Sequence, residues 1–185
     1  MKGIVFTEFM EMVEQAYGYE MVDALIEDNE LPSGGAYTNV GTYDFQEMVQ
    51  LVTSLSEKVQ APVPKLLHTF GCHLFKSFKK GYPAFLEAAS DAFDFLESIE
   101  KYIHVEVRKL YPDAELPTFK THRPNEQTLE MLYFSERRMG DFALGLIESS
   151  LKYYDEQANV TMTPLNESKS EVQFTIERQM KNIAG

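Results

Sequence analysis

The chain has 185 residues, of which 44% are hydrophobic and 25% are charged. Its net charge at pH 7 is −12, and residues 1–60 alone carry 11 acidic and 2 basic side chains, a net −9. This composition indicates a single folded globular domain and excludes a disordered or fibrous chain. Because a strongly acidic chain repels phosphate groups, we expect neither nucleic acid nor an anionic membrane as a partner.

Cysteine content and the absence of long apolar runs indicate the compartment. Cys72 is the only cysteine, so neither an internal disulfide nor a zinc site of several cysteines can form, which favours a reducing environment. The first residues contain Glu8 and no long apolar run, unlike a signal peptide. No segment approaches 18 uninterrupted apolar residues. We therefore expect no membrane span and a cytoplasmic location.

Apolar residues recur at helical spacing through the first part of the chain. The first predicted helix ends at Gly18, and two more lie near residues 21–26 and 45–55. The outer face of the first helix is predicted to carry three acidic residues, Glu8, Glu11 and Glu14. Residues 61–64, Ala-Pro-Val-Pro, interrupt the pattern and mark the expected boundary between two lobes.

The second lobe is predicted to begin with helices and to end in a sheet. A strongly apolar helix covers residues 66–78, and a long helix begins at an N-cap, Ser90, and continues to Leu110. Alternating apolar residues predict strands near 129–133, 160–162 and 172–176, with a helix over 137–154 between the first two. The expected class is α+β. A helical lobe spans residues 1–62, and a second lobe with a small antiparallel sheet spans 63–185.

The four histidines form no His-x-x-x-His pair, and there is no Cys-x-x-Cys pair, so spacing predicts no mononuclear zinc site. His104 lies in the long apolar helix beside Ile103 and Val105. Two interpretations remain open for this residue. It is an ordinary helix histidine, or it is an axial ligand to a cofactor metal such as heme iron, for which a neutral imidazole in an apolar cavity is suited.

A second cluster lies where a predicted strand meets a helix. Residues two apart in a strand point the same way, so Tyr133, Ser135 and Arg137 are expected to converge. Two hydroxyl groups and a guanidinium at one place are suited to a carboxylate or a phosphate.

His104, followed by Pro117 and then by Tyr133-x-Ser135-x-Arg137, resembles the H-NOX family, the heme-nitric oxide/oxygen binding domains that include bacterial sensors and the heme domain of soluble guanylate cyclase. The likeness extends from the Met1-Lys2-Gly3 start to the final strands. It implies that residues 1–62 form the distal lobe and 63–185 the proximal lobe. It also implies that His104 is the proximal ligand of ferrous heme b and that Pro117 contacts the porphyrin.

The resemblance also assigns the heme propionates to Tyr133, Ser135 and Arg137. The residues that it places in the distal pocket and the neighbouring core are Val5, Phe9, Leu74, Phe78, Phe142 and Leu146. In the family, stable dioxygen binding goes with a distal tyrosine, and the corresponding position here is Phe142. Bound dioxygen develops negative charge that needs a hydrogen-bond donor, which Phe142 does not supply. We therefore expect a nitric oxide sensor that excludes dioxygen, unless another tyrosine, Tyr17 or Tyr82, supplies the donor.

The expected mechanism is release of the bond between iron and His104, with the lobes shifting across residues 61–64. Nitric oxide, and also carbon monoxide, are the implied ligands. The resemblance suggests a separate histidine kinase, or a cyclic di-GMP synthase or phosphodiesterase, as the output partner. Some relatives hold a structural zinc with C-terminal cysteines, and since no cysteine follows Cys72 that zinc is not expected.

Other functions remain open at this point. A reversible dioxygen sensor or a nitric oxide scavenger would use the same heme. A heme-free interaction adaptor would use the same fold for protein contacts alone. An enzyme is not expected, because the sequence shows no paired acid and base beside a cavity and no Gly-rich nucleotide loop.

Overall fold

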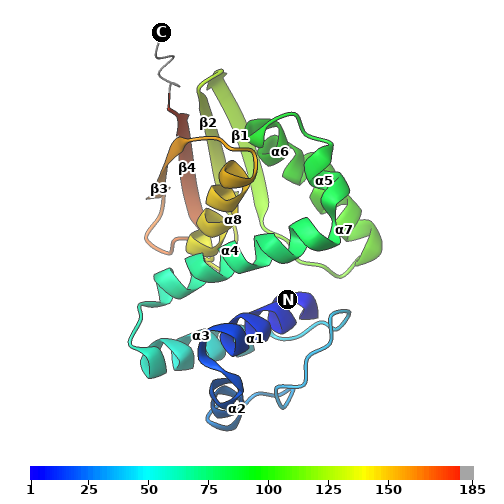
Figure 1. Cartoon of the computed structure of the whole chain (residues 1–185), viewed down its shortest axis with the longest axis vertical. Helices are drawn as coiled ribbons and strands as arrows, with labels where there is room; N and C mark the ends of the chain where they lie inside the picture. The colour runs from blue at the N-terminus through cyan, green and yellow to red at the C-terminus, as the bar shows by residue number, and fades with distance from the viewer. Residues whose placement is uncertain (180–185) are drawn as a thin grey trace.

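The computed structural model describes residues 1–179, and Figure 1 shows two lobes on opposite sides of a long helix. Three helices lie below that helix in the view of Figure 1 and form the first lobe: α1 (Gly3–Tyr17), α2 (Tyr19–Glu27) and α3 (Phe45–Val59). The long helix is α4 (Val63–Gly81). The predicted helices of this part are confirmed, and α1 ends at Gly18 as expected. No helix in the described residues is long and apolar enough to cross a membrane.

The second lobe combines helices with a four-stranded antiparallel sheet of order β1-β2-β4-β3, which confirms the α+β class. Its strands are β1 (Thr118–Asn125), β2 (Thr128–Phe134), β3 (Ala158–Pro164) and β4 (Glu171–Arg178). Its helices are α5 (Pro83–Glu87), α6 (Ala92–Ser98), the π-helical turn η1 (Ile99–Ile103), α7 (His104–Leu110) and α8 (Gly140–Tyr153). Helix α8 packs against both α4 and the sheet.

The helix predicted from Ser90 to Leu110 is not one continuous α-helix. Asp91 is the N-cap, because its carboxylate accepts a hydrogen bond from the N–H of Asp94 at 2.8 Å. The Ser90 hydroxyl donates to the Asp94 carboxylate instead. The middle of the segment is the π-helical turn η1. Apolar spacing does not reveal such a turn, since helical periodicity continues on both sides of it.

The apolar pattern also fails to predict β1. This strand is at the edge of the sheet, and its residues alternate between exposed and half-buried positions. Edge strands carry polar and charged residues, and Pro124 within the segment argues against a strand. The helix predicted from residue 137 begins later, at Gly140, because residues 136 and 137 form a turn and Arg138 adopts a left-handed φ of 55°.

The buried hydrophobic side chains form two clusters, one in each lobe. The first-lobe cluster includes residues of α1, α2, α3 and one face of α4, where Leu66, Phe70 and Leu74 are buried. The second-lobe cluster joins the sheet, α6, α8 and the later part of α4, beginning at Phe75. Helix α4 therefore contributes to both cores.

Helices α4 and α8 cross in close contact because glycine lies at the crossing on both sides. A Cβ atom on Gly145 would lie 2.2 Å from the carbonyl oxygen of His68, and one on Gly71 would lie 2.2 Å from the carbonyl oxygen of Phe142. Neither space can open without moving backbone, so the two helices can approach this closely only with glycine at these positions.

We expect Gly145→Ala to destabilise the fold by about 1–3 kcal/mol, the usual cost of overpacking a core. This cost exceeds the gain of up to about 1 kcal/mol that alanine brings to a helix. Urea unfolding measures the difference. Gly81→Ala is the control, because Gly81 is the last residue of α4 and has no atom within 4 Å of its Cβ position. An equal effect at both positions would contradict the close crossing.

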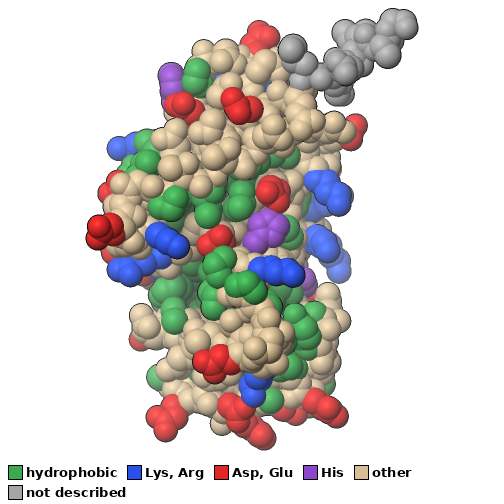
Figure 2. Space-filling model, turned by 90° about the vertical axis from the view of Figure 1, so that its left-hand side faces the viewer, with side chains coloured by type: hydrophobic (Ala, Val, Ile, Leu, Met, Phe, Trp, Pro, Cys, Tyr) green, Lys and Arg blue, Asp and Glu red, His purple; other side chains and the backbone are tan. Residues whose placement is uncertain are grey.

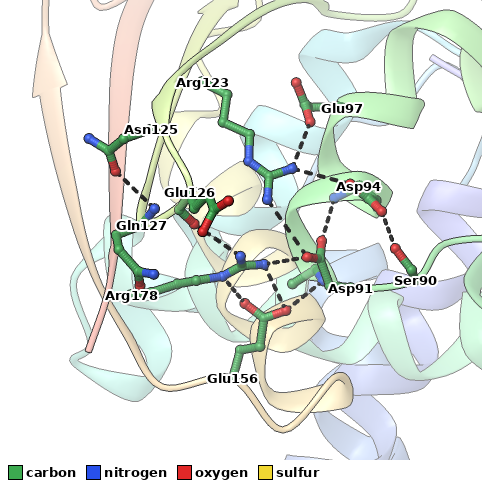
Figure 3. A network of polar contacts seen from close by, with 11 residues as sticks. Ser90, Asp91, Asp94, Glu97, Arg123, Asn125, Glu126, Gln127, Glu156 and Arg178 are labelled. Atoms are coloured by element: carbon green, nitrogen blue, oxygen red, sulfur yellow. Dashed lines mark hydrogen bonds and ion pairs between the residues drawn. The ribbon is translucent and has the colours of Figure 1, made fainter. Parts of the chain in front are cut away.

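A polar network joins the ends of β4 and β1 to the start of α6 (Figure 3). Arg178 lies at its centre, with Nε 2.6 Å from Glu156 and Nη2 2.8 Å from Asp91. Its guanidinium also stacks on the Phe93 ring at 3.8 Å. Arg123 extends the network to Asp94 at 3.2 Å. The network thus fixes the start of the helical segment that leads to His104.

The network makes stability depend on pH through Asp91. Burial opposes the charge on Asp91, but the Asp94 N–H and Arg178 outweigh it and hold its pKa below the usual 3.8. The stabilisation is therefore present above about pH 4 and is lost as the pH falls through the lowered pKa. We expect Asp91→Asn, which keeps the N-cap, to be less stable than the wild type at pH 7. In urea unfolding the difference is predicted to shrink below pH 4, and a constant difference would contradict this assignment.

Candidate functional site

His104 is held at one ring nitrogen and free at the other. It is the first residue of α7, directly after the π-helical turn, and only 9% of it is exposed. Its Nδ1 is 3.0 Å from Oε2 of Glu100. Its Nε2 makes no hydrogen bond to another group in residues 1–179. A carboxylate on one imidazole nitrogen and a free second nitrogen are the usual arrangement of a histidine that binds a metal.

Glu100 connects three elements around His104. Besides the imidazole, its Oε2 accepts a hydrogen bond from the Phe119 N–H of β1 at 3.2 Å. Its Oε1 lies 3.3 and 3.4 Å from the two terminal nitrogens of Arg108. Glu100 was not predicted as a site residue. Its spacing of four residues from His104 was the available signal, because such pairs share a helix face.

The charge states of this pair also suit metal binding. Burial lowers the pKa of His104, and the Glu100 carboxylate opposes this without reversing it. Burial works against the charge on Glu100, but the hydrogen bonds from His104 and the Phe119 N–H lower its pKa below the usual value. At pH 7 the imidazole is therefore neutral and the carboxylate ionised, and neutral imidazole is the form that binds metals.

We expect Glu100→Gln to weaken the hold of His104 on a metal by about 10- to 100-fold, the usual effect of an outer-shell partner. The amide keeps the shape but withdraws the negative charge that makes the imidazole a stronger donor. Heme loss to an acceptor globin measures the change. Glu106→Gln is the matched control, since Glu106 is on the exposed side of α7 and pairs with Lys109. Equal loss rates in the two variants would contradict this role of Glu100.

The predicted group of Tyr133, Ser135 and Arg137 comes together, but in a turn rather than along a strand. Strand β2 ends at Phe134, so strand alternation does not extend to Arg137. Ser135 Oγ accepts the N–H of Arg137 at 3.2 Å, and the Tyr133 hydroxyl accepts the N–H of Met139 at 3.1 Å. Burial raises the pKa of Tyr133, while the Ser135 hydroxyl and the Arg137 charge act against this from nearby.

Arg137 already holds a carboxylate. Its Nη2 donates to the Glu115 carboxylate at 2.8 Å and its Nη1 to the Glu115 backbone carbonyl at 2.7 Å. The Arg137 side chain is 16% exposed, whereas that of Glu115 is 85% exposed. A mostly buried guanidinium thus takes the carboxylate of a surface residue. Glu115 stands in for the kind of carboxylate, such as a propionate, that the sequence predicts at this position.

The same region touches the first lobe. The Arg137 guanidinium lies 5.8 Å from the centre of the Phe45 ring of α3. In the loop between α7 and β1, Asp113 accepts a hydrogen bond from Thr42 at 2.6 Å and pairs with Lys2 at 3.4 Å. Groups that bind a carboxylate and groups that join the lobes are therefore neighbours.

Pro117 lies between this loop and β1. It is half-buried and two residues before Phe119, whose ring is 5.9 Å from His104 and 5.6 Å from Tyr133. Pro117 is thus close in the chain to an aromatic ring that lies beside His104. Its contact with a porphyrin stays a prediction.

Five of the predicted distal residues belong to the first-lobe cluster or pack against it: Val5, Phe9, Leu74, Phe142 and Leu146. The Phe70 ring links two of them, with its centre 5.3 Å from the Phe9 ring and 5.0 Å from the Phe142 ring. Phe78 is not part of this cluster. It is 36% exposed and lies edge-on to Tyr82, with ring centres 6.2 Å apart.

The two tyrosines considered as alternative donors lie outside the first-lobe cluster. Tyr17 and Tyr82 are each 43% exposed. Tyr82 packs beside Phe78 and Phe85 at the junction of α4 and α5. The buried residues of the cluster around Phe142 are apolar, and neither Tyr17 nor Tyr82 belongs to it. Two other tyrosines, Tyr37 and Tyr43, pack against the cluster at the Phe6 ring.

These residues fit a heme group. A ferrous heme needs a neutral imidazole on one side and partners for two propionate carboxylates at its edge. His104 offers an unpartnered Nε2, and Arg137 already binds a carboxylate. Tyr133 and Ser135 add hydroxyl groups beside the same turn.

Comparison with known proteins agrees with the fit to heme. A family model described as "Haem-NO-binding" matches residues 2–162. The Fe(II) unliganded H-NOX protein from K. algicida is 42% identical, with a TM-score of 0.94, and the match covers 98% of each chain. The H-NOX from Shewanella woodyi, solved with IWP-051 in the Fe(II)CO state, is 42% identical, with a TM-score of 0.84 and coverage of 99% and 98%.

An H-NOX protein from S. oneidensis in the Fe(II)NO state has the same fold, with a TM-score of 0.89 at 24% identity and coverage of 97% and 99%. No curated protein sequence matches the chain.

Proposed function

This chain belongs to the H-NOX family of heme-based gas-sensor domains, and we propose that it binds nitric oxide at ferrous heme b and excludes dioxygen. The observation that carries the proposal is the buried His104, neutral at pH 7, with Nδ1 fixed by Glu100 and Nε2 without a partner. Carbon monoxide is a second expected ligand. We assign no enzymatic reaction to the domain.

Four residues hold the heme in this proposal. His104 Nε2 is the proximal ligand, and Arg137, Tyr133 and Ser135 bind the propionates. Pro117 contacts the porphyrin from the His104 side. Heme held by these residues would supply a ferrous iron that binds a diatomic gas. No structural zinc bound by C-terminal cysteines is expected, because no cysteine follows Cys72.

Selectivity comes from the absence of a donor on the distal side. The distal pocket in this proposal comprises Val5, Phe9, Leu74, Phe142 and Leu146, with Phe78 at its margin. None of these side chains carries a hydrogen-bond donor. Dioxygen bound to ferrous iron develops negative charge and needs such a donor, whereas nitric oxide carries little charge. An apolar pocket therefore penalises dioxygen and tolerates nitric oxide.

The signal is release of the His104 imidazole. Once free, His104 loosens the end of η1 and the start of α7, and Glu100 passes the change to β1 through the Phe119 N–H. The contacts of Asp113 and Arg137 with the first lobe then carry it across the hinge at residues 61–64. Residues 1–62 move as the distal lobe against residues 63–185, and ligand binding selects between the two arrangements.

We place the output in a separate cytoplasmic protein, a histidine kinase or an enzyme that makes or degrades cyclic di-GMP. The family likeness supports this choice, and the acidic first lobe offers a charged surface for such a contact, with acidic side chains gathered at the lower end of the molecule in Figure 2.

Resonance Raman spectroscopy of the reduced protein tests the release step. We expect an iron–histidine stretching band without ligand, absent from His104→Ala, that disappears when nitric oxide is added. Persistence of the band at saturating nitric oxide would show that His104 stays bound, and the proposed signal would then be wrong.

A further inference from the structure

Three side chains with metal-binding atoms meet between α1 and α4, away from His104. They are Glu8 and Glu11 of α1 and His73 of α4, and one ligand atom from each lies within 4.8 Å of the others. The prediction that Glu8 lies on the outer face of α1 is wrong. Its side chain is only 16% exposed and faces α4, where the Ser77 hydroxyl donates to its carboxylate.

One ring nitrogen of His73 is buried without a hydrogen-bond partner. Its Nε2 is the one buried side-chain nitrogen or oxygen in residues 1–179 without a hydrogen bond. The Glu8 carboxylate oxygen lies 3.3 Å away, close enough for an ion pair but without hydrogen-bond geometry. Buried polar atoms are almost always satisfied, so an unsatisfied one in contact with carboxylates needs an explanation.

A bound metal ion explains both the distance and the geometry. Zinc takes histidine nitrogen and carboxylate oxygen at about 2.0–2.2 Å in a tetrahedron, so two ligand atoms lie about 3.4 Å apart. The 3.3 Å between His73 Nε2 and Glu8 Oε2 matches such an edge. Ser77, bonded to the Glu8 carboxylate, supplies the kind of outer-shell partner that orients a ligand.

The charge of the cluster also favours a divalent cation. Neither Glu8 nor Glu11 pairs with a lysine or arginine in the part of the chain that the structure describes. Glu11 accepts only from Gln15, at 2.9 Å. The two carboxylates carry a charge of −2, within a lobe whose residues 1–60 have a net −9. A divalent ion neutralises the pair without a competing cation.

We propose that Glu8, Glu11 and His73 form a site for a divalent transition-metal ion, with Zn²⁺ as the preferred occupant and water completing the tetrahedron. Sequence spacing predicted no mononuclear zinc site, because His73 is far from Glu8 and Glu11 in the chain and only the packing of α4 on α1 brings them together. The site joins α1 to α4. Its ligands are next in the chain to Phe9 and Leu74, which are buried in the first-lobe cluster. A bound ion therefore clamps the two helices that carry part of the distal wall. Metal binding here does not depend on the proposed gas-sensing function.

Isothermal titration of the heme-loaded protein with ZnCl₂, after removal of metals by a chelator, tests the site. We expect one Zn²⁺ per chain. His73→Ala is predicted to weaken Zn²⁺ binding at least tenfold. Loss of an outer-shell partner already weakens metal binding by roughly 10- to 100-fold, and loss of a ligand itself costs at least as much. Glu11→Gln removes a ligand at an exposed position and provides a second variant if His73→Ala does not fold.

Two variants serve as matched controls. His68→Ala removes a histidine of α4 that pairs with Glu148, and Glu14→Gln removes an exposed acid of α1. Both are expected to bind Zn²⁺ like the wild type. X-ray absorption at the zinc edge, which is separate from iron, should show only nitrogen and oxygen neighbours with an imidazole pattern.

Three results would overturn the proposal. The first is the absence of stoichiometric Zn²⁺ binding, which would leave an ion pair between His73 and Glu8. The second is equal Zn²⁺ affinity in the ligand variants and the controls, and the third is sulfur neighbours from Cys72 at the zinc edge; each of these two would place zinc elsewhere. None of these results bears on heme or nitric oxide binding, so failure of this site and failure of the proposed function can be told apart.

Discussion

His104→Gly is expected to remove the protein's hold on heme iron and to lower heme affinity by more than the roughly 100-fold upper effect of an outer-shell change. The substitution deletes the imidazole while Arg137, Tyr133 and Ser135 remain to bind the propionates. Added imidazole is expected to enter the space and restore the absorption spectrum. Heme titration with and without imidazole measures both effects. His68→Gly, at a half-exposed position on α4, is the control and should bind heme normally.

The same variant tests the release step without a known output partner. If release of His104 is the signal, heme-loaded His104→Gly resembles the wild type with nitric oxide. Hydrogen exchange of η1, α7 and α1 is then expected to be faster than in the unliganded wild type and equal to that of the wild type with nitric oxide. Exchange that matches the unliganded wild type would separate histidine release from the conformational change.

Phe142→Tyr is expected to make the protein bind dioxygen. The Phe142 ring lies against Phe70 in the apolar first-lobe cluster, so a hydroxyl added there is a donor on the proposed distal side. A hydrogen bond to a charged acceptor contributes about 1.5–3 kcal/mol. Since 1.4 kcal/mol is tenfold, dioxygen affinity should rise about 10- to 150-fold. Absorption spectra of the reduced variant in stepped dioxygen concentrations measure the change.

Phe142→Leu is the matched control, because it changes the volume at the same position without adding a donor. We expect it to ignore dioxygen as the wild type does. Dioxygen binding by the leucine variant would show that space, rather than hydrogen bonding, limits the wild type. Lack of binding by the tyrosine variant would place the selectivity outside Phe142.

The sequence predicted most of the fold because apolar periodicity is strong in this chain. Helices α1, α3, α4 and α8 and strands β2 and β4 bury one regular face, and this is the signal that periodicity detects. The edge strand β3 has no buried residue, but its half-buried positions include the apolar Val160 and Met162. Strand β1, at the other edge, was missed because its half-buried positions include the polar Thr121 and Arg123. The π-helical turn was missed because it adds a residue without changing the apolar pattern around it.

The candidate site could be predicted only in part, for a different physical reason. His104, Tyr133, Ser135 and Arg137 form an ordered motif along the chain. The partners that fix their chemistry come from elsewhere in the fold. Glu115 meets Arg137 across 22 residues, and His73 meets Glu8 across 65. Such pairs depend on tertiary packing, which sequence spacing does not encode.

Glu8 shows how this affects an interpretation. The pattern of α1, taken by itself, places Glu8 among acidic residues on one face of the helix and predicts that its side chain is exposed to solvent. The approach of α4 covers it and brings Ser77 and His73 to its carboxylate. The helix was predicted correctly, but the face that it presents to a neighbour was not.

The measurement that tests the central claim most directly is the absorption spectrum of the purified, reduced protein, recorded under argon, then in air, then with nitric oxide. We predict a five-coordinate ferrous heme spectrum that does not change in air and changes when nitric oxide is added. A stable ferrous–oxygen spectrum in air would keep the heme assignment and contradict the selectivity argued from Phe142. Absence of a Soret band after expression with ample heme would contradict the role of His104 and favour a heme-free adaptor.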